Sequence, residues 1–225
     1  APDLLSLAQP QTIRKRTWYT VPKRALDIIG ATLALLVLSP AMIAIGLIIK
    51  ITSPGPTILA QERVGKGGKI FPFYKFRSMY TDCDNSVDKR FARNYINGNS
   101  GSGTPSDGVF KPANDKRVSA VGKVLRQTSL DELPQLLNVL KGEMSLVGPR
   151  PSMPYEVDMH KPWHFRRLEV LPGMTGLAQI NGRSSLTFRD IVKIDTAYIE
   201  QASLLLDLKI LLQTIPVVLS TRGAR

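Results

Sequence analysis

The sequence predicts an α+β protein with a re-entrant membrane helix hairpin and a small, mostly helical domain that carries a short β-hairpin. Three patterns indicate this fold. Residues 28–49 contain no charged side chain, leucines recur at helical spacing over 133–140 and 204–219, and two strand-like segments flank a glycine-rich turn at 65–68. With 225 residues, the chain is long enough for one domain with an appendage.

The composition predicts a polyanionic partner. Thirty basic and 18 acidic side chains give a formal net charge of +12, which suits nucleic acid, an anionic membrane surface or a phosphorylated substrate. Cys83 is the single cysteine, so an intramolecular disulfide and a cysteine-based metal site are excluded. His160 and His164 are the two histidines, and a histidine-rich zinc site is therefore not expected.

Residues 1–22 are predicted to form a basic leader. Trp18 and Tyr19 follow Arg14, Lys15 and Arg16 closely, and aromatic rings beside basic groups suit the headgroup region of a membrane. A disordered leader is the alternative for residues 1–12.

Residues 23–52 are predicted to enter and leave the membrane on one side. The charge-free run is long enough to cross a bilayer core, but Ser39 and Pro40 lie near its middle. Proline removes a backbone hydrogen bond and bends a helix, and a serine hydroxyl can bind a carbonyl that is freed in this way. Basic residues on both flanks favour a helix-break-helix hairpin. A straight span and a buried helix of a soluble protein are the alternatives.

Residues 53–225 are predicted to form the main domain. A β-hairpin occupies about 57–79, and its glycine-rich turn is either a plain hairpin loop or a phosphate cradle. Lys75 and Arg77 alternate with Phe76 and should share one face of the second strand.

Residues 81–114 are polar and rich in glycine and serine, which predicts a flexible insertion. Residues 155–169 and 188–200 are predicted helices, 177–183 an extended piece, and 204–219 an amphipathic helix on the core or in the membrane interface.

Asp131 and Glu132 are adjacent carboxylates at a predicted helix start. Pro134 is tolerated only in a first turn, so the helix should begin near Asp131, where the helix dipole favours an ionised carboxylate. Arg126 precedes the pair and Arg150 follows it between two prolines that stiffen the backbone. Acids beside guanidinium groups indicate phosphate chemistry with a divalent cation. The structural alternative is a helix cap with a solvent-facing arginine nearby.

Several of these stretches, taken in order, resemble the bacterial sugar transferase family, the monotopic polyprenyl-phosphate phosphoglycosyl transferases. The matching stretches span about residues 23–219: Lys23-Arg-Ala-Leu-Asp27, Ser39-Pro40, Ser53-Pro-Gly-Pro56, Gln61 to Gly68, Tyr74-Lys-Phe-Arg-Ser-Met79, Leu125 to Gln135, Ser145-Leu-Val-Gly-Pro-Arg-Pro151, Pro172 to Gln179 and Asn181-Gly-Arg183. Each stretch alone is a weak signal, whereas the ordered set is specific.

The resemblance implies a function and a place in the cell. Such enzymes move a phosphosugar from a UDP-sugar to polyprenyl (undecaprenyl) phosphate and release UMP, using Mg²⁺ and an Asp-Glu dyad. This is the first membrane step of bacterial polysaccharide or glycoconjugate assembly, at the cytoplasmic face of the inner membrane. Anionic lipids are expected contacts, nucleic acid is not, and a homodimer is left open.

The resemblance also implies roles for single residues. Asp131 would be the nucleophile that forms a covalent phosphosugar intermediate, and Asp131 and Glu132 would hold Mg²⁺. Five cationic residues would bind substrate phosphates: Arg126, Arg150, Arg183, Lys75 and Arg77. Ser39 and Pro40 would form the membrane break.

Two other functions compete with this interpretation. The positive charge permits a nucleic-acid-binding protein, but the sequence shows no nucleic-acid motif and its basic residues are scattered. A non-enzymatic membrane scaffold is the second alternative, and the intact Asp-Glu pair argues against it.

Overall fold

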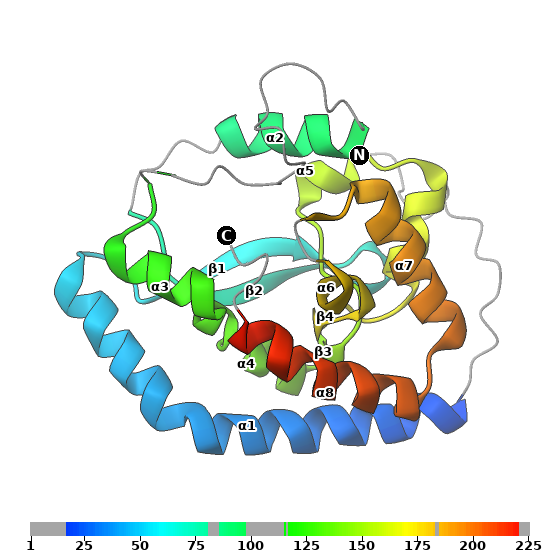
Figure 1. Cartoon of the computed structure of the whole chain (residues 1–225), viewed down its shortest axis with the longest axis horizontal. Helices are drawn as coiled ribbons and strands as arrows, with labels where there is room; N and C mark the ends of the chain where they lie inside the picture. The colour runs from blue at the N-terminus through cyan, green and yellow to red at the C-terminus, as the bar shows by residue number, and fades with distance from the viewer. Residues whose placement is uncertain (1–16, 81–85, 98–114, 116, 183–184, 221–225) are drawn as a thin grey trace.

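The computed structural model describes residues 17–80, 86–97, 115, 117–182 and 185–220, and Figure 1 shows the whole chain. The helices are α1 (Thr17–Thr52), α2 (Ser86–Asn97), α3 (Ala120–Thr128), α4 (Gln135–Lys141), α5 (Pro154–Val157), α6 (Leu177–Asn181), α7 (Phe188–Gln201) and α8 (Leu204–Leu219). The strands are β1 (Ile58–Val64), β2 (Ile70–Phe76), β3 (Ser145–Val147) and β4 (Gly173–Thr175). Short 3₁₀ segments lie at Lys66–Gly68, Leu130–Glu132 and Pro162–Glu169. The mixed, helix-rich fold with its β-hairpin is as predicted.

Two small sheets lie among the helices. β1 and β2 form the predicted antiparallel hairpin, in which Ile58 faces Phe76 and Val64 faces Ile70. β3 and β4 form a parallel pair that the sequence did not predict. Residues 177–181 are helical, not extended as predicted, and α2 occupies residues 86–97 of the predicted insertion. Residues 17–22 of the predicted leader 1–22 belong to α1, whereas residues 1–16 and the rest of the predicted insertion 81–114 lie outside the described residues.

Helix α1 corrects the predicted helix-break-helix. It is one helix of 36 residues with Pro40 inside it, and Figure 1 shows it running along one edge of the molecule and then changing direction. Because Pro40 has no N–H, the carbonyl of Leu36 loses its usual helical donor. The Ser39 hydroxyl donates to that carbonyl at 3.1 Å, as the sequence suggested. A serine bond of this kind lets the helix bend without breaking.

Both arms of α1 pack against the same domain. Before Pro40, Ala31 is fully buried beside Phe71, Phe73, Leu136, Val139 and Met144. After Pro40, Ile49 is buried with Phe76 and Leu125. The helix therefore lies along the domain over most of its length and does not project from it.

Polar contacts near the N-terminal end of α1 hold this helix against α4 and β3. The Arg24 guanidinium donates to the Val139 and Leu140 carbonyls at the end of α4, at 2.6 and 2.9 Å. The Asp27 carboxylate accepts bonds from the Ser145 hydroxyl and the Leu146 amide of β3, both at 2.9 Å. The first arm of α1 thus holds both α4 and β3 in place.

A second group of polar contacts joins α1 to α7 and α8. Asp207 of α8 is completely buried, and its carboxylate accepts bonds from Lys23 at 2.9 Å and from the Tyr19 and Tyr198 hydroxyls at 2.8 Å. A buried carboxylate is tolerated when it is paired and hydrogen-bonded in this way. Asp207, which interrupts the apolar run of 204–219, therefore lies on the inner face of α8.

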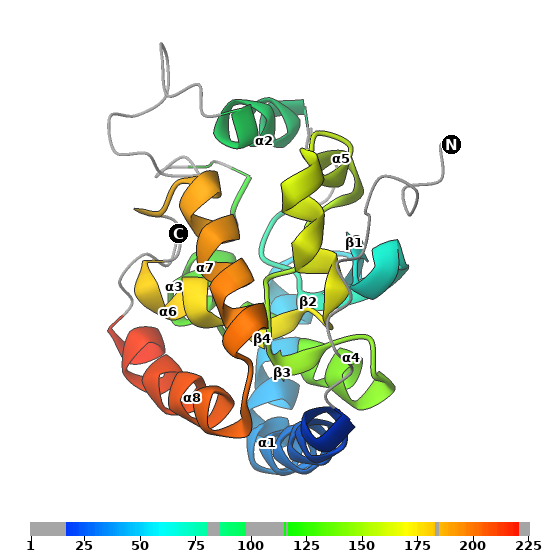
Figure 2. The same cartoon turned by 90° about the vertical axis from the view of Figure 1, so that its right-hand side faces the viewer.

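The outer faces of α1 and α8 are apolar. Figures 1 and 2 show the two helices side by side at one edge of the molecule, with α2 and α5 at the opposite edge. Large exposed apolar side chains on them include Ile29, Leu33, Leu36, Val37, Ile43, Leu47 and Ile51 of α1 and Leu205, Leu208, Leu212 and Ile215 of α8. By length and composition, α1 is the one described helix that could cross a membrane. Exposed apolar side chains in this number on two neighbouring helices fit association with a membrane.

Candidate active site

Asp131 lies in a 3₁₀ turn between α3 and α4. Helix α3 ends at Thr128 because Ser129 adopts a left-handed conformation, with φ of 59°, and its amide bonds back to Arg126. Residues Leu130–Glu132 form the 3₁₀ turn, and α4 begins at Gln135 after Pro134. The predicted helix start near Asp131 was therefore too early, since a separate turn precedes α4.

The leucines on either side of the two acids anchor this turn in the core. Leu130 and Leu133 pack against the cluster of Ile49, Phe76 and Leu125, so the turn shares an apolar core with β2, α3 and the second arm of α1. Asp131 and Glu132 lie between these leucines and are half-buried. The apolar contacts fix the backbone while the carboxylates stay accessible at the surface of the domain.

Glu132 and Arg150 form a bidentate ion pair. Arg150 Nη2 lies 2.5 Å from Glu132 Oε1 and Arg150 Nη1 lies 3.1 Å from Glu132 Oε2. The side chains are 41% and 25% exposed for Arg150 and Glu132, so solvent or a ligand can still reach both. The negative charge of Glu132, with a smaller contribution from Asp131, raises the pKa of Arg150. The structure thus brings Asp131, Glu132 and Arg150 together, as the sequence predicted.

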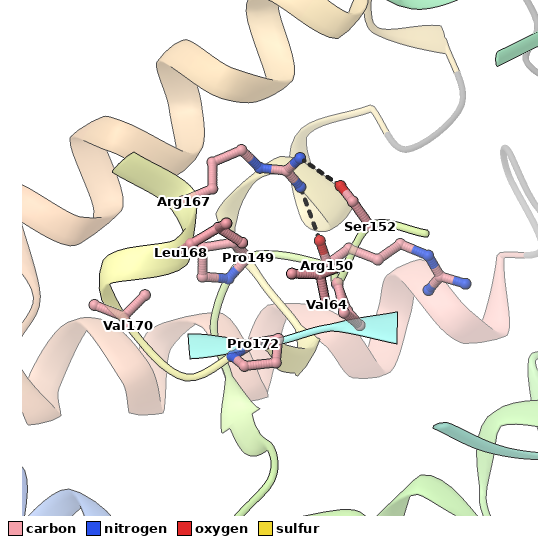
Figure 3. Close-up of a pocket in the computed structure, with 10 residues that line it drawn as sticks. Val64, Pro149, Arg150, Ser152, Arg167, Leu168, Val170 and Pro172 are labelled. Atoms are coloured by element: carbon pink, nitrogen blue, oxygen red, sulfur yellow. Dashed lines mark hydrogen bonds between the residues drawn. The ribbon is translucent and has the colours of Figure 1, made fainter. Parts of the chain in front are cut away.

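A small hollow lies behind Arg150. Its lining comes from the strand end at Val64, the loop at Pro149–Ser152 and the segment that carries Arg167 and Val170. Figure 3 shows the Arg150 side chain pointing away from Arg167, Pro149 and Val170, while its backbone carbonyl points toward Arg167. The guanidinium is therefore presented to Glu132 outside the hollow.

The other predicted cations lie in different surroundings. Arg126 Nε donates to the Ser78 hydroxyl at 3.0 Å, and Lys75 Nζ donates to Gln61 Oε1 at 3.2 Å. Arg77 is only 3% exposed and donates to the carbonyl and hydroxyl of Ser53, just after α1. Lys75 and Arg77 therefore contact different partners, and Arg183 lies outside the described residues. Phosphate binding by these four residues stays a prediction.

Arg63 is a charged residue near the site that sequence reasoning missed. It is 9% exposed, and its guanidinium donates to the Pro151 carbonyl at 3.0 Å and to Gln61 Oε1 at 3.1 Å. Burial, and then the positive charge of Arg150, lowers the pKa of Arg63 to about 10. Its place in a strand beside Gln61 was visible in the sequence, but nothing local indicated that the strand meets residue 151.

The carboxylates offer part of a metal site. Within the described ranges, no group of three or more acidic, histidine or cysteine side chains could hold a metal ion. Mg²⁺ commonly takes only one or two protein carboxylates and completes its shell with substrate phosphates and water. Asp131 and Glu132 fit that partial set, because both are oxygen ligands and they are adjacent in one turn.

The site lies within a stretch of the chain that is similar to known proteins. The bacterial sugar transferase family matches residues 18–221. A galactosyl transferase, CpsE, of Streptococcus agalactiae is 44% identical over 209 residues, which are 92% of this chain and 44% of the relative. An undecaprenyl-phosphate galactose phosphotransferase of Salmonella typhimurium is 42% identical, over 90% of this chain and 41% of its own.

A third relative names a different sugar. It is a UDP-N-acetylgalactosamine-undecaprenyl-phosphate N-acetylgalactosaminephosphotransferase of Aeromonas hydrophila, 41% identical over 92% of this chain and 46% of its own length. The chain spans less than half the length of each of these three relatives. The similarity covers α1, the β-hairpin and the whole region around Asp131 and Arg150.

Proposed function

Since this chain belongs to the bacterial sugar transferase family, we propose that it is a phosphoglycosyl transferase that moves a phosphosugar from a UDP-sugar to polyprenyl phosphate. The observation that carries this proposal is the turn at 130–132, where Asp131 lies beside Glu132 and the Glu132–Arg150 ion pair. The names of the relatives from Salmonella and Aeromonas support the lipid acceptor, and that of the Aeromonas relative supports a UDP-sugar donor.

The reaction would proceed in two steps at one phosphorus atom. In the first, a carboxylate oxygen of Asp131 bonds to the β-phosphorus of the UDP-sugar, and the bond from that phosphorus to the bridging oxygen breaks. The electron pair leaves with UMP. In the second, an oxygen of polyprenyl phosphate bonds to the same phosphorus and the Asp131 carboxylate is restored. Covalent catalysis of this kind lets a soluble donor and a lipid acceptor use one site in turn.

Arg150 and Glu132 would prepare the site for these steps. A guanidinium held by a bidentate carboxylate is oriented in advance, which favours interaction with phosphate oxygens. Arg126 would contribute a second guanidinium from α3. Asp131 and Glu132 would hold Mg²⁺, whose positive charge would stabilise the negative charge on the phosphate oxygens.

We also infer that the chain binds the cytoplasmic face of the inner membrane through α1 and α8, as a monotopic protein. The packing of both arms of α1 against one domain supports this, because a straight span would carry one arm away from the domain. The exposed apolar side chains of both helices would then lie in the lipid, with the exposed Lys50 near the headgroups.

The topology is tested with single cysteines at Thr20 and Thr52, two exposed residues near opposite ends of α1, in a Cys83→Ser background. A membrane-impermeant maleimide should label both positions in inverted vesicles and neither in intact spheroplasts. Labelling of the two positions from opposite sides would show that α1 spans the membrane and would contradict the re-entrant arrangement.

The function is tested by mixing the purified chain with undecaprenyl phosphate, Mg²⁺ and a panel of UDP-sugars. We expect UMP and a lipid-linked phosphosugar from at least one donor. Release of UDP in place of UMP would contradict the proposal, because UDP is the product when the sugar alone is transferred. Chain heated to unfolding is the control for contaminating hydrolysis.

A further inference from the structure

We propose that Arg63 and Arg167 are positioning residues that hold the backbone at Arg150 and at the two residues after it, so that the Arg150 guanidinium is presented to Glu132 in a single orientation. The inference rests on the proposed function, because it assigns these two arginines to the same site. Neither was among the residues that the sequence singled out, and neither touches Glu132 in the described contacts.

The segment Pro149–Ser152 is fixed at each of its carbonyl groups. The Pro149 carbonyl accepts a bond from the Gly173 amide, and the Ser152 carbonyl accepts one from the Val64 amide, both at 2.9 Å. Between them, the Arg150 carbonyl accepts from Arg167 Nη2 at 2.8 Å and the Pro151 carbonyl from Arg63 Nη1 at 3.0 Å. Two of the four residues are prolines with fixed φ, so little backbone freedom is left around Arg150.

Arg167 reaches this segment from a buried ion pair. Its side chain is 6% exposed, and its Nε donates to Asp195 Oδ2 of α7 at 2.8 Å. The remaining nitrogens face the segment, since Nη1 donates to the Ser152 hydroxyl at 3.2 Å and Nη2 to the Arg150 carbonyl, as Figure 3 shows. One guanidinium thus joins α7 to both Arg150 and Ser152 of the loop, and its planar fork fixes the relative position of these two residues.

Arg63 reaches the same segment from β1. Within the described part of the chain it has no carboxylate at ion-pair distance, and its guanidinium donates to the Pro151 carbonyl and the Gln61 amide oxygen. It also lies over the Phe73 ring, with the guanidinium carbon 5.1 Å from the ring centre. A buried arginine without a carboxylate is costly, and a neutral structural role would be served by an apolar side chain at lower cost. Its donation to Pro151 gives a reason for the charge to be there.

The two arginines act through the backbone and not through the phosphates. The hydrogen bonds to the carbonyls of Arg150 and Pro151 set the direction in which the Arg150 side chain leaves the loop. A displacement of about 1 Å in a catalytic group can cost about a hundredfold in rate, so loss of either contact should affect turnover even if Arg150 itself is unchanged. This is the physical link from α7 and β1 to the chemistry at Asp131.

The test uses the full chain with Arg167→Lys and Arg63→Lys, each alone and combined with Arg150→Ala. At position 167, lysine keeps the positive charge beside Asp195, but its single nitrogen lacks the fork that reaches Asp195 and two loop groups together. At position 63, lysine lacks the fork that reaches the Pro151 carbonyl and Gln61 together. Each single variant should lower UMP release between about tenfold and about a hundredfold. It should change the same parameter, kcat or KM, that Arg150→Ala changes.

In the Arg150→Ala background, either lysine variant should change UMP release by less than about threefold, because the effect has to pass through Arg150. Arg166→Lys is the matched control. Arg166 is the neighbour of Arg167 in sequence, and it pairs with Glu200 at 3.1 Å away from the loop. This variant should keep normal turnover.

An activity-independent readout separates this inference from the proposed function. The Nε–Hε NMR signal of Arg150, assigned by its loss in Arg150→Ala, should shift in both lysine variants and stay in place in Arg166→Lys. If the unaltered chain releases no UMP, the proposed function fails and the NMR signal alone decides the positioning role. If Arg167→Lys does not fold, Arg63→Lys decides, since it leaves the Arg167–Asp195 pair intact. An unmoved signal, normal turnover, or an effect that multiplies with that of Arg150→Ala would overturn the inference.

Discussion

Replacing Asp131 with asparagine is expected to abolish phosphosugar transfer while the protein stays folded. An amide has the size of the carboxylate and fits the same 3₁₀ turn, but it is a far weaker nucleophile. The flanking Leu130 and Leu133 contacts, which hold the turn in the core, are untouched by this change. We therefore expect UMP release to fall by at least about a thousandfold, as it does when a covalent nucleophile is removed.

The measurement is turnover of the purified variant together with its thermal unfolding temperature. Asp158→Asn is the matched control, because Asp158 is an exposed acid in the loop after α5. That control should keep both turnover and stability. Near-normal turnover of the Asp131→Asn variant would show that Asp131 only shapes the turn, which is the structural alternative for an acid in this position.

The second large effect concerns the donor substrate alone. If Asp131 becomes covalently modified, UDP-sugar should release one equivalent of UMP before any lipid is added, and full turnover should follow ping-pong kinetics. Direct attack by the lipid phosphate in a ternary complex would give no UMP without the lipid. Rapid-quench measurement of UMP against enzyme concentration separates the two routes, and the Asp131→Asn variant should show no burst.

Local patterns in the sequence predicted the elements that depend on neighbouring residues. The β-hairpin follows from two strand-like segments around a glycine-rich turn, and the bond from Ser39 to the Leu36 carbonyl follows from the chemistry of Pro40. The grouping of Asp131, Glu132 and Arg150 was also predicted, on the strength of charge, spacing and the family resemblance.

Other features depend on contacts between distant residues, and the sequence did not reveal them. The β3–β4 pair joins residues 145–147 to 173–175 through strands of three residues, which are too short for a periodic pattern to appear. Arg77 directly follows the hairpin at a position typical of an exposed cation, yet it is buried and donates to Ser53, which lies just after α1. The predicted start of α4 was too early. The left-handed conformation of Ser129 depends on tertiary contacts, and a serine in the sequence does not by itself indicate it.

Helix α1 shows how tertiary packing decides between local alternatives. Pro40 alone allows a break, a kink or a bend. The buried contacts of Ala31 before it and Ile49 after it favour a bend, because both arms gain by lying on one domain. The leucines beside Asp131 pack against the cluster that includes Ile49, so α1 belongs to the apolar core that supports the turn with the proposed nucleophile.

The central claim is that Asp131 carries the phosphosugar between donor and acceptor, and intact-protein mass spectrometry tests it most directly. The chain is mixed with a UDP-sugar that supports turnover and with Mg²⁺, without lipid, and is then quenched in acid. We predict a mass increase equal to the phosphosugar, which undecaprenyl phosphate removes and which is absent from the Asp131→Asn variant. An unmodified mass in a preparation that is fully active with lipid would contradict the covalent route.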